Sequence, residues 1–154
     1  GVEAADLDLI LFATLSPDWN FPGSSCLLQA RLGAPGVATL DIRNQCTGFV
    51  YGIAIAYQFI RAGSMKRILV VGSEVHSSGL DQTDRGRDVT VLFGDGAGAT
   101  VLQRREGGQG VLATRLGSDG TKADILAMPG GGSRQPAATR SSSSPPAHLQ
   151  RKQA

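Results

Sequence analysis

Cys46 is the residue whose position in this sequence most favours chemistry. It follows the β-branched segment 37–42 by four residues and opens the apolar segment 46–61, which predicts a strand, a sharp turn and a helix. The positive end of a helix dipole stabilises a thiolate, and the backbone N–H groups there can hold an oxyanion. This is the order of a nucleophile elbow, with cysteine in the place of serine. A small buried hydrophobic residue is the competing interpretation of Cys46, and it is the one we assign to Cys26.

His76 is the second side chain in a position suited to chemistry. It comes just after a predicted strand at residues 67–72, and ligands of α/β proteins often bind beyond the carboxyl ends of strands. We expect His76 to line a pocket or to serve Cys46 as a general base. A single histidine without a second ligand makes no metal site, so none is expected. The other histidine, His148, lies in a polar tail and is set aside.

Arg85 lies in a long polar segment, residues 73–88, whose turn-forming composition predicts a functional loop. Two interpretations of this arginine stay open. In the first, it pairs with the carboxylates of the same loop, which are Asp81, Asp84 and Asp88. In the second, its planar guanidinium binds a phosphate.

The glycine-rich segment 94–98 has the spacing G-x-G-x-G and is followed by a predicted strand. A dinucleotide-binding turn requires a helix at that point. The pattern therefore predicts a tight hairpin between strands at 89–93 and 99–103. Asp95 is expected to accept hydrogen bonds from turn amides, which is a more common task for this residue type than catalysis.

Short apolar runs alternate with helical segments along the chain. Strands are predicted at residues 7–14, 37–42, 67–72, 111–116 and 125–128, and helices at 26–32 and 46–61. The second helix is apolar on almost every side and is expected to be buried, with Gly48 and Gly52 allowing close packing. This alternation predicts an α/β layered fold with parallel strands.

Composition and charge exclude several classes of protein. Residues 1–132 hold 11 Lys/Arg and 13 Asp/Glu, whereas residues 133–154 hold four basic residues and no acidic one. The basic charge belongs to the tail, so nucleic-acid binding by the body is not expected. No apolar run approaches the ~18 residues of a membrane span, so no membrane partner is expected. Two cysteines form no disulfide framework, which predicts a cytoplasmic protein.

The composition changes after residue 130. Residues 131–154 are rich in Ser, Pro and basic side chains and have no apolar periodicity, which predicts a low-complexity, disordered tail. We therefore expect one folded region at residues 1–130, and any chemistry lies within it.

Four motifs, in the order of a known family, resemble the β-ketoacyl-acyl-carrier-protein synthase III family of the thiolase-like fold. They are NQCTGF at residues 44–49, RILVVGSE at 67–74, DRG at 84–86 and FGDGAGA at 93–99. The resemblance extends from about residue 7 to residue 129. It implies a thiolase-like layered fold, of which this chain carries part of the N-terminal half.

The resemblance also implies a role for particular residues. Cys46 matches the acylated nucleophile of the family. Phe21 matches the phenylalanine that reaches across the dimer into the acyl pocket of the partner. Arg85 matches the arginine beside the adenine and phosphates of coenzyme A. The positions that match the lining of the substrate tunnel are His76, Phe93 and Leu126.

The implied reaction is an acyl transfer followed by a Claisen condensation. An acyl group passes from acyl-CoA to the cysteine, and malonyl-carrier protein then loses CO2 and attacks the thioester. The implied partners are acyl-CoA, an acyl carrier protein and a second copy of the enzyme, with no metal or redox cofactor.

This sequence also departs from the family. The histidine, the asparagine and the glycine-rich segment of the second half of the family are not found in it, so we interpret the chain as an internal portion of such an enzyme. The loop around His76 and the extra Arg87-Asp88 pair favour a relative from specialised metabolism that uses a different acyl group. Two further alternatives are an inactive remnant or interaction piece, and a small α/β binding module with a structural Cys46.

Overall fold

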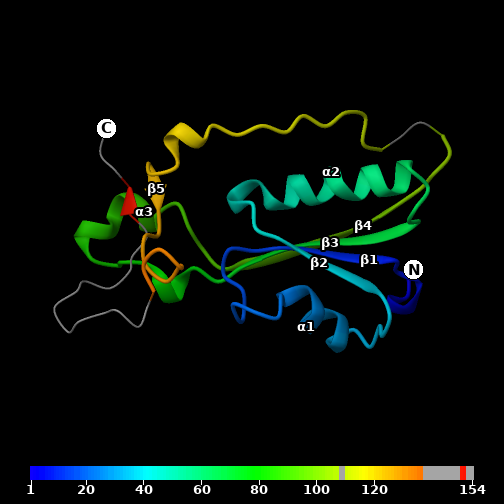
Figure 1. Ribbon diagram of the computed structural model, residues 1–154, viewed down its shortest axis with the longest axis horizontal. Coiled ribbons are helices and arrows are strands. Elements are labelled where there is room, and N and C mark those ends of the chain that lie inside the picture. The colour runs from blue at the N-terminus through cyan, green and yellow to red at the C-terminus, as the bar shows by residue number, and fades with distance from the viewer. Residues whose placement is uncertain (108–109, 137–149, 152–154) are drawn as a thin grey trace. The chain divides into compact units, whose positions relative to one another are not determined.

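The computed structural model describes residues 1–107, 110–136 and 150–151 (Figure 1). Two compact units divide the chain. The first contains Gly1–Glu74 and Gly96–Leu116, and the second contains Val75–Asp95 and the residues from Gly117 onward. The strands are β1 Leu9–Ala13, β2 Ala38–Ile42, β3 Arg67–Glu74, β4 Gly96–Gln103, β5 Leu126–Ala127 and β6 Gln150–Arg151, and the α-helices are α1 Ser24–Arg31, α2 Gly48–Arg61 and α3 Arg87–Thr90.

A four-stranded sheet with the order β2-β1-β3-β4 forms the centre of the first unit. β1 pairs in parallel with both β2 and β3, as the alternation of strands and helices predicts. β4, which contains the predicted strand at 99–103, is antiparallel to β3. The chain reaches β4 without a crossover helix, because it returns beside the end of β3, where Gly96 pairs with Glu74.

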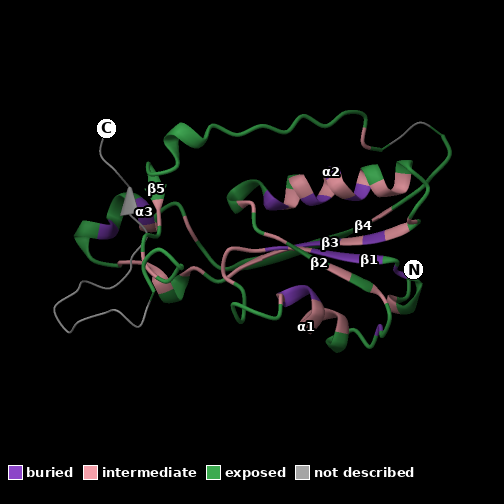
Figure 2. Cartoon of the chain, in the orientation of Figure 1, coloured by how far each residue is buried: buried purple, intermediate pink, exposed green. Residues whose placement is uncertain are grey.

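Helices cover both faces of this sheet, with α2 on one side and α1 on the other (Figure 1). β1 is therefore buried over most of its length (Figure 2), and its Ile10 and Leu11 side chains are fully buried. A strand covered on both faces requires an uninterrupted apolar run, which is what the sequence has at this point.

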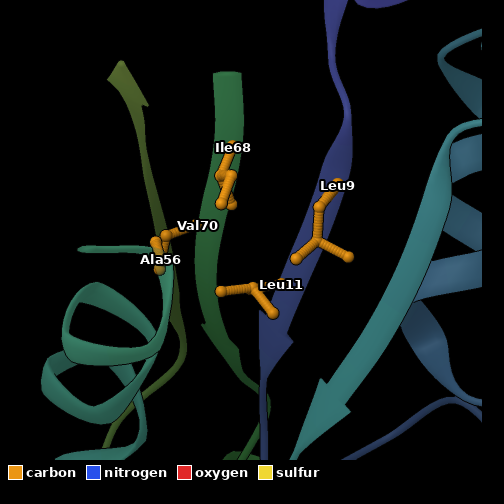
Figure 3. Close-up of a cluster of buried hydrophobic side chains, with 5 residues drawn as sticks. All are labelled: Leu9, Leu11, Ala56, Ile68 and Val70. Atoms are coloured by element: carbon orange, nitrogen blue, oxygen red, sulfur yellow. The ribbon is translucent and has the colours of Figure 1, made fainter. Parts of the chain in front are cut away.

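The core under α2 is a cluster of five buried side chains (Figure 3). The strand register places pairs of them side by side, because Leu9 is opposite Ile68 and Leu11 is opposite Val70. Successive side chains of a strand alternate between its faces, so these four share the face that α2 covers. Ala56 completes the cluster from the helix.

Two glycines let α2 pack close to the sheet, as predicted. A Cβ atom on Gly48 would lie 3.0 Å from Ala13 Cβ, and one on Gly52 would lie 2.8 Å from Val70 Cγ1. Residues four apart share one helix face, and in this helix that face is turned toward the sheet. The expectation that α2 is buried on every side is wrong in this chain, because Val50 on the helix is 56% exposed.

Three of the smaller predicted elements differ from the structure. Residues 89–93 do not form a strand, because Arg87–Thr90 is a short helix that continues the 3-10 turn Asp84–Gly86. The glycines at 96 and 98 belong to β4, so the predicted hairpin at 94–98 is also wrong. Residues 111–116 are extended but have no strand partner within the described part of the chain.

The predicted strand at 125–128 is confirmed as β5, which pairs antiparallel with β6. β6 lies within the predicted tail 131–154. Much of that tail, including His148, lies outside the described residues. None of the helices in the described part of the chain has the length and apolar content that a membrane span requires.

Candidate active site

Cys46 lies in a sharp turn between the end of β2 and the start of α2. The turn is the 3-10 segment Gln45–Thr47, and Gln45 has a positive φ of 42°. Its backbone is therefore in the left-handed region, which turns the chain sharply. Thr47 is the N-cap residue of α2, so Cys46 precedes the helix by two residues instead of opening it as predicted. Its side chain is exposed.

Hydrogen bonds between Asn44 and Thr47 brace this turn. Asn44 Nδ2 donates to Thr47 Oγ1 at 2.9 Å, and Thr47 Oγ1 donates to the Asn44 carbonyl oxygen at 3.1 Å. Cys46 lies between the two braced residues. The turn thus presents the thiol to solvent beside the N-terminus of an apolar helix.

Cys26 has the environment of a structural cysteine. It lies in α1, is half-buried, and its Sγ donates to the Gly23 carbonyl oxygen at 3.0 Å. The start of this helix is capped from β2, because Asp41 Oδ1 accepts from the backbone N–H of Ser25 at 3.2 Å and Asp41 Oδ2 accepts from its hydroxyl. Cys26 is therefore held inside a capped helix.

Phe21 is presented by the segment that joins β1 to α1, and it is 85% exposed. A carboxylate at the end of β3 holds the start of this segment. Glu74 Oε1 accepts from the backbone N–H of Leu15 at 2.9 Å, and Oε2 accepts from the Ser16 hydroxyl at 2.8 Å. Trp19, which the sequence analysis did not single out, is 58% exposed in the same segment. The sequence feature that could have drawn attention to Trp19 is its aromatic side chain two positions before Phe21.

In the second unit, His76 and Phe93 lie together. Their ring centroids are 4.9 Å apart and their planes are inclined by 58°. Asp95 fixes the turn that begins at His76, because its Oδ1 accepts from the backbone N–H groups of His76 at 2.7 Å and Ser77 at 2.8 Å. Its Oδ2 accepts from the Ser77 hydroxyl at 2.6 Å.

The expectation that Asp95 accepts from turn amides is confirmed, although the amides belong to a segment distant in sequence. The Ser77 hydroxyl, the Ser77 amide and the His76 amide together hold the pKa of the Asp95 carboxyl below its usual range. The carboxylate therefore connects the His76 segment with the glycine-rich segment that follows Phe93.

Arg85 pairs with a carboxylate of its own loop. Its Nε donates to Asp81 Oδ2 at 2.8 Å, and its Nη2 lies 2.7 Å from the same oxygen in an ion pair. The hydroxyl of Thr83, the Arg85 guanidinium and the Thr83 amide hold the pKa of the Asp81 carboxyl well below its usual range. The first interpretation of Arg85 is thus confirmed for Asp81. Asp84 pairs with Arg87 instead, at 3.1 Å.

The six predicted site residues divide between the two units. Cys46 and Phe21 belong to the first unit, and the other four belong to the second. Among these four, Leu126 lies in β5 and is 39% exposed. No group of three or more His, Cys, Asp or Glu side chains in the described residues could hold a metal ion.

A surface groove lies apart from Cys46, at the other end of the sheet. Parallel strands start at one edge of a sheet and end at the other, and the groove includes the start of β3, whereas Cys46 follows the end of β2. Its lining residues are Ile60, Gly63, Met65, Lys66, Arg67, Gln103 and Arg104. None of the six predicted site residues is among them.

The arrangement of the sheet, its two covering helices and the cysteine turn matches solved structures. A crystal structure of 3-oxoacyl-[acyl-carrier-protein] synthase III from Aquifex aeolicus superposes with a TM-score of 0.82 and 38% identity, covering 98% of this chain and 44% of that one. The fold is therefore the thiolase-like α/β fold of acyl-transferring enzymes. The family model of 3-oxoacyl-[acyl-carrier-protein (ACP)] synthase III matches residues 40–120, which are more than half of the chain. The chain belongs to this family.

Two further comparisons extend this result. The β-ketoacyl-[acyl-carrier-protein] synthase III of Caldanaerobacter subterraneus is 50% identical over 136 residues, which are 88% of this chain and 40% of that protein. A priming β-ketosynthase of a polyketide biosynthetic pathway superposes with a TM-score of 0.72 at 29% identity, covering 84% of this chain and 38% of that one. The chain thus spans about 40% of the length of the curated relatives it matches.

Proposed function

We propose that Cys46 is the nucleophile of a 3-oxoacyl-acyl-carrier-protein synthase III-type acyltransferase. The observation that carries the proposal is the exposed thiol in the braced turn before α2, within a chain of this family. Backbone N–H groups at the start of the helix are donors for an oxyanion that forms when the thiolate attacks a thioester carbonyl.

The proposed reaction has two steps, an acyl transfer to Cys46 and a condensation. In the first, Cys46 Sγ bonds to the acyl carbon of acyl-CoA, the carbon–sulfur bond to coenzyme A breaks, and coenzyme A leaves as the thiol with one proton. In the second, malonyl-carrier protein loses CO2, and the resulting carbanion attacks the acyl-cysteine and releases the cysteine sulfur. Neither step requires a metal or redox cofactor.

The remaining site residues are proposed to bind substrate. Arg85 has an exposed guanidinium suited to the phosphates of coenzyme A. His76 and Phe93, whose rings are in contact, and Leu126 are proposed to line the tunnel for the acyl chain. The acyl chain is apolar, and aromatic and aliphatic side chains are the usual lining of such pockets.

A homodimer is the assembly we propose for the enzyme. Two features support it: Phe21 is 85% exposed, and β4 lies at the edge of the sheet with almost all of its residues exposed. Unpaired strand edges and large exposed aromatic residues are common at interfaces between protein chains. We place the enzyme in the cytoplasm, where cysteine thiols stay reduced.

The acyl group need not be that of primary fatty-acid synthesis. The similarity to a priming β-ketosynthase of a polyketide pathway favours an enzyme of specialised metabolism as the second candidate. Both candidates use the same cysteine chemistry and differ in the acyl-CoA that they accept. A panel of acyl-CoA substrates of different chain length and branching separates them.

Acylation of the chain by acyl-CoA, followed by intact mass, tests the proposal. We expect a mass increase equal to one acyl group, mapped by proteolysis to Cys46 and absent in Cys46→Ser. Cys26→Ser is the matched control and should be acylated like the wild type. Acylation of Cys26, or none at any thiol in a folded sample, would contradict the assignment and favour a non-catalytic interaction piece.

A further inference from the structure

Asp81 is the centre of a hydrogen-bond network around Arg85. Its carboxylate accepts a hydrogen bond from Arg85 Nε, forms an ion pair with Arg85 Nη2, and accepts two bonds from Thr83, from the backbone N–H at 3.1 Å and from the hydroxyl at 2.7 Å. The side chain of Asp81 is 10% exposed, whereas that of Arg85 is 70% exposed. The arginine is thus anchored at a nearly buried carboxylate and extends into solvent.

The backbone at Asp81 is fixed as well. The Thr90 hydroxyl donates to the Asp81 carbonyl oxygen at 2.7 Å. Gly86 lies directly against this residue, since a Cβ on Gly86 would overlap the same oxygen and no side chain can be placed there. The backbone of the residue that pairs with Arg85 is therefore held by its neighbours Thr90 and Gly86.

This pairing leaves part of the guanidinium free. The group carries five N–H donors in one plane. Asp81 accepts from Nε and lies within ion-pair distance of Nη2. Among the described residues, Asp81 is the one partner of this side chain. Asp81 holds the inner edge of the guanidinium, and the outer edge, with Nη1, is available for an anion.

We propose that Asp81 is a positioning residue, which holds the Arg85 guanidinium so that its outer edge receives a phosphate of the coenzyme A nucleotide. The inference rests on the proposed function of Arg85. An exposed arginine loses side-chain freedom when it binds a ligand, and the pairing with Asp81 reduces that freedom before a ligand binds. The depressed pKa of the carboxyl supports the inference, because the pair stays ionised well into the acidic range.

The acylation half-reaction tests this inference with two acyl donors. Acetyl-CoA carries the phosphorylated nucleotide, and acetyl-pantetheine lacks it, so a phosphate contact affects the first donor alone. We expect Asp81→Asn to raise the half-saturating acetyl-CoA concentration roughly two- to fivefold, and Arg85→Ala to raise it about tenfold. The limiting rate of acylation and the reaction with acetyl-pantetheine should not change.

A matched control and a double variant separate positioning from a merely structural role. Asp84→Asn makes the same change three residues away, at a carboxylate that pairs with Arg87 and not with Arg85, and it should behave as the wild type. Asp81→Asn added to Arg85→Ala should raise the half-saturating concentration no further, because the positioned group is already gone.

The outcomes separate the proposed phosphate contact of Arg85 from the positioning role of Asp81. If Arg85→Ala leaves saturation by acetyl-CoA unchanged, the proposed phosphate contact of Arg85 is wrong. If Arg85→Ala weakens saturation and Asp81→Asn does not, the contact stands and the positioning role of Asp81 is wrong. A lower half-saturating acetyl-CoA concentration in Asp81→Asn would also contradict the positioning role, since the carboxylate would then compete with the phosphate for Arg85. If Asp81→Asn weakened acylation by acetyl-CoA and by acetyl-pantetheine equally, Asp81 would only stabilise the loop.

Discussion

The carboxylate oxygen Oδ1 of Asp95 lies 2.7 Å from the backbone nitrogen of His76, although 19 positions separate the two residues in the sequence. The same oxygen also accepts from the Ser77 amide. These bonds bring the turn after His76 to the segment that contains Phe93, whose ring contacts the imidazole. Asp95 therefore links the two segments that carry the aromatic rings proposed to line the acyl tunnel.

Asp95→Ala is expected to release the His76 turn. Backbone hydrogen exchange at His76 and Ser77 should become about tenfold faster, because each amide loses its charged acceptor. Asp119→Ala is a matched control, since Asp119 likewise accepts from an amide and a hydroxyl, both of Thr121, in another turn. It should leave exchange at His76 unchanged. Unaltered exchange in Asp95→Ala would show that other contacts hold this turn.

Gly52→Ala should destabilise the fold even though alanine favours helices. Alanine in a helix gains about 1 kcal/mol over glycine, but its Cβ would lie 2.8 Å from Val70 Cγ1, against a branched side chain with little freedom. Overpacking of about 1–3 kcal/mol exceeds that gain, so we expect a net loss of about 1 kcal/mol. Urea unfolding measures it. Val70→Ala in the same chain should make the added methyl group less harmful; an equal penalty in both backgrounds would locate the strain elsewhere.

Cys46 should react with iodoacetamide about tenfold faster than Cys26 near neutral pH. Cys46 is exposed, whereas Cys26 is half-buried and its thiol donates to the Gly23 carbonyl. Peptide mapping over time gives both rates. In urea the two thiols should react alike, which shows that the difference belongs to the folded chain. Faster labelling of Cys26 in the folded sample would remove the basis for the nucleophile assignment.

Acid should destabilise the chain partly through Asp8. Its Oδ2 accepts from the backbone N–H groups of Lys66 at 2.6 Å and Arg67 at 2.8 Å, and these bonds hold the pKa of the carboxyl below its usual value of 3.8. A depressed pKa stabilises the folded state above the unfolded value, and this stabilisation is lost as the pH falls through the folded value. The urea concentration at the unfolding midpoint should therefore decrease as the pH is lowered below about 4. This decrease should be smaller in Asp8→Asn. Identical pH profiles for the two chains would contradict this role.

The sheet and its two covering helices could be predicted from the sequence. Their signals are local: the apolar run around Leu11, the β-branched segment before Ile42, and the glycines that let α2 approach the sheet. The direction of β4 could not be predicted, because it depends on where the chain returns after leaving β3. Residues 89–93 are rich in β-forming side chains, yet the hydrogen bond from Thr90 to the Asp81 carbonyl accompanies a helical turn there.

The sequence predicts where the candidate residues lie relative to the strands and helices, but it does not predict their contacts. The placement of Cys46 between a strand and an apolar helix could be inferred from pattern, while the left-handed Gln45 that moves it ahead of the helix could not. For Arg85, spacing left Asp81, Asp84 and Asp88 as equal partners. In the structure Asp81 is the partner, in a loop where Gly86 lies directly against the Asp81 backbone, and no periodicity reveals that approach.

Glu74 and Gly96 are opposite one another in the ladder between β3 and β4. The segment Val75–Asp95 therefore leaves the sheet and rejoins it at neighbouring points. Such an excursion can change in length or content without shifting the register of β3 and β4 on either side. An insertion or deletion within Val75–Asp95 would therefore leave the sheet, in which β2 precedes Cys46, and its strand pairing unchanged.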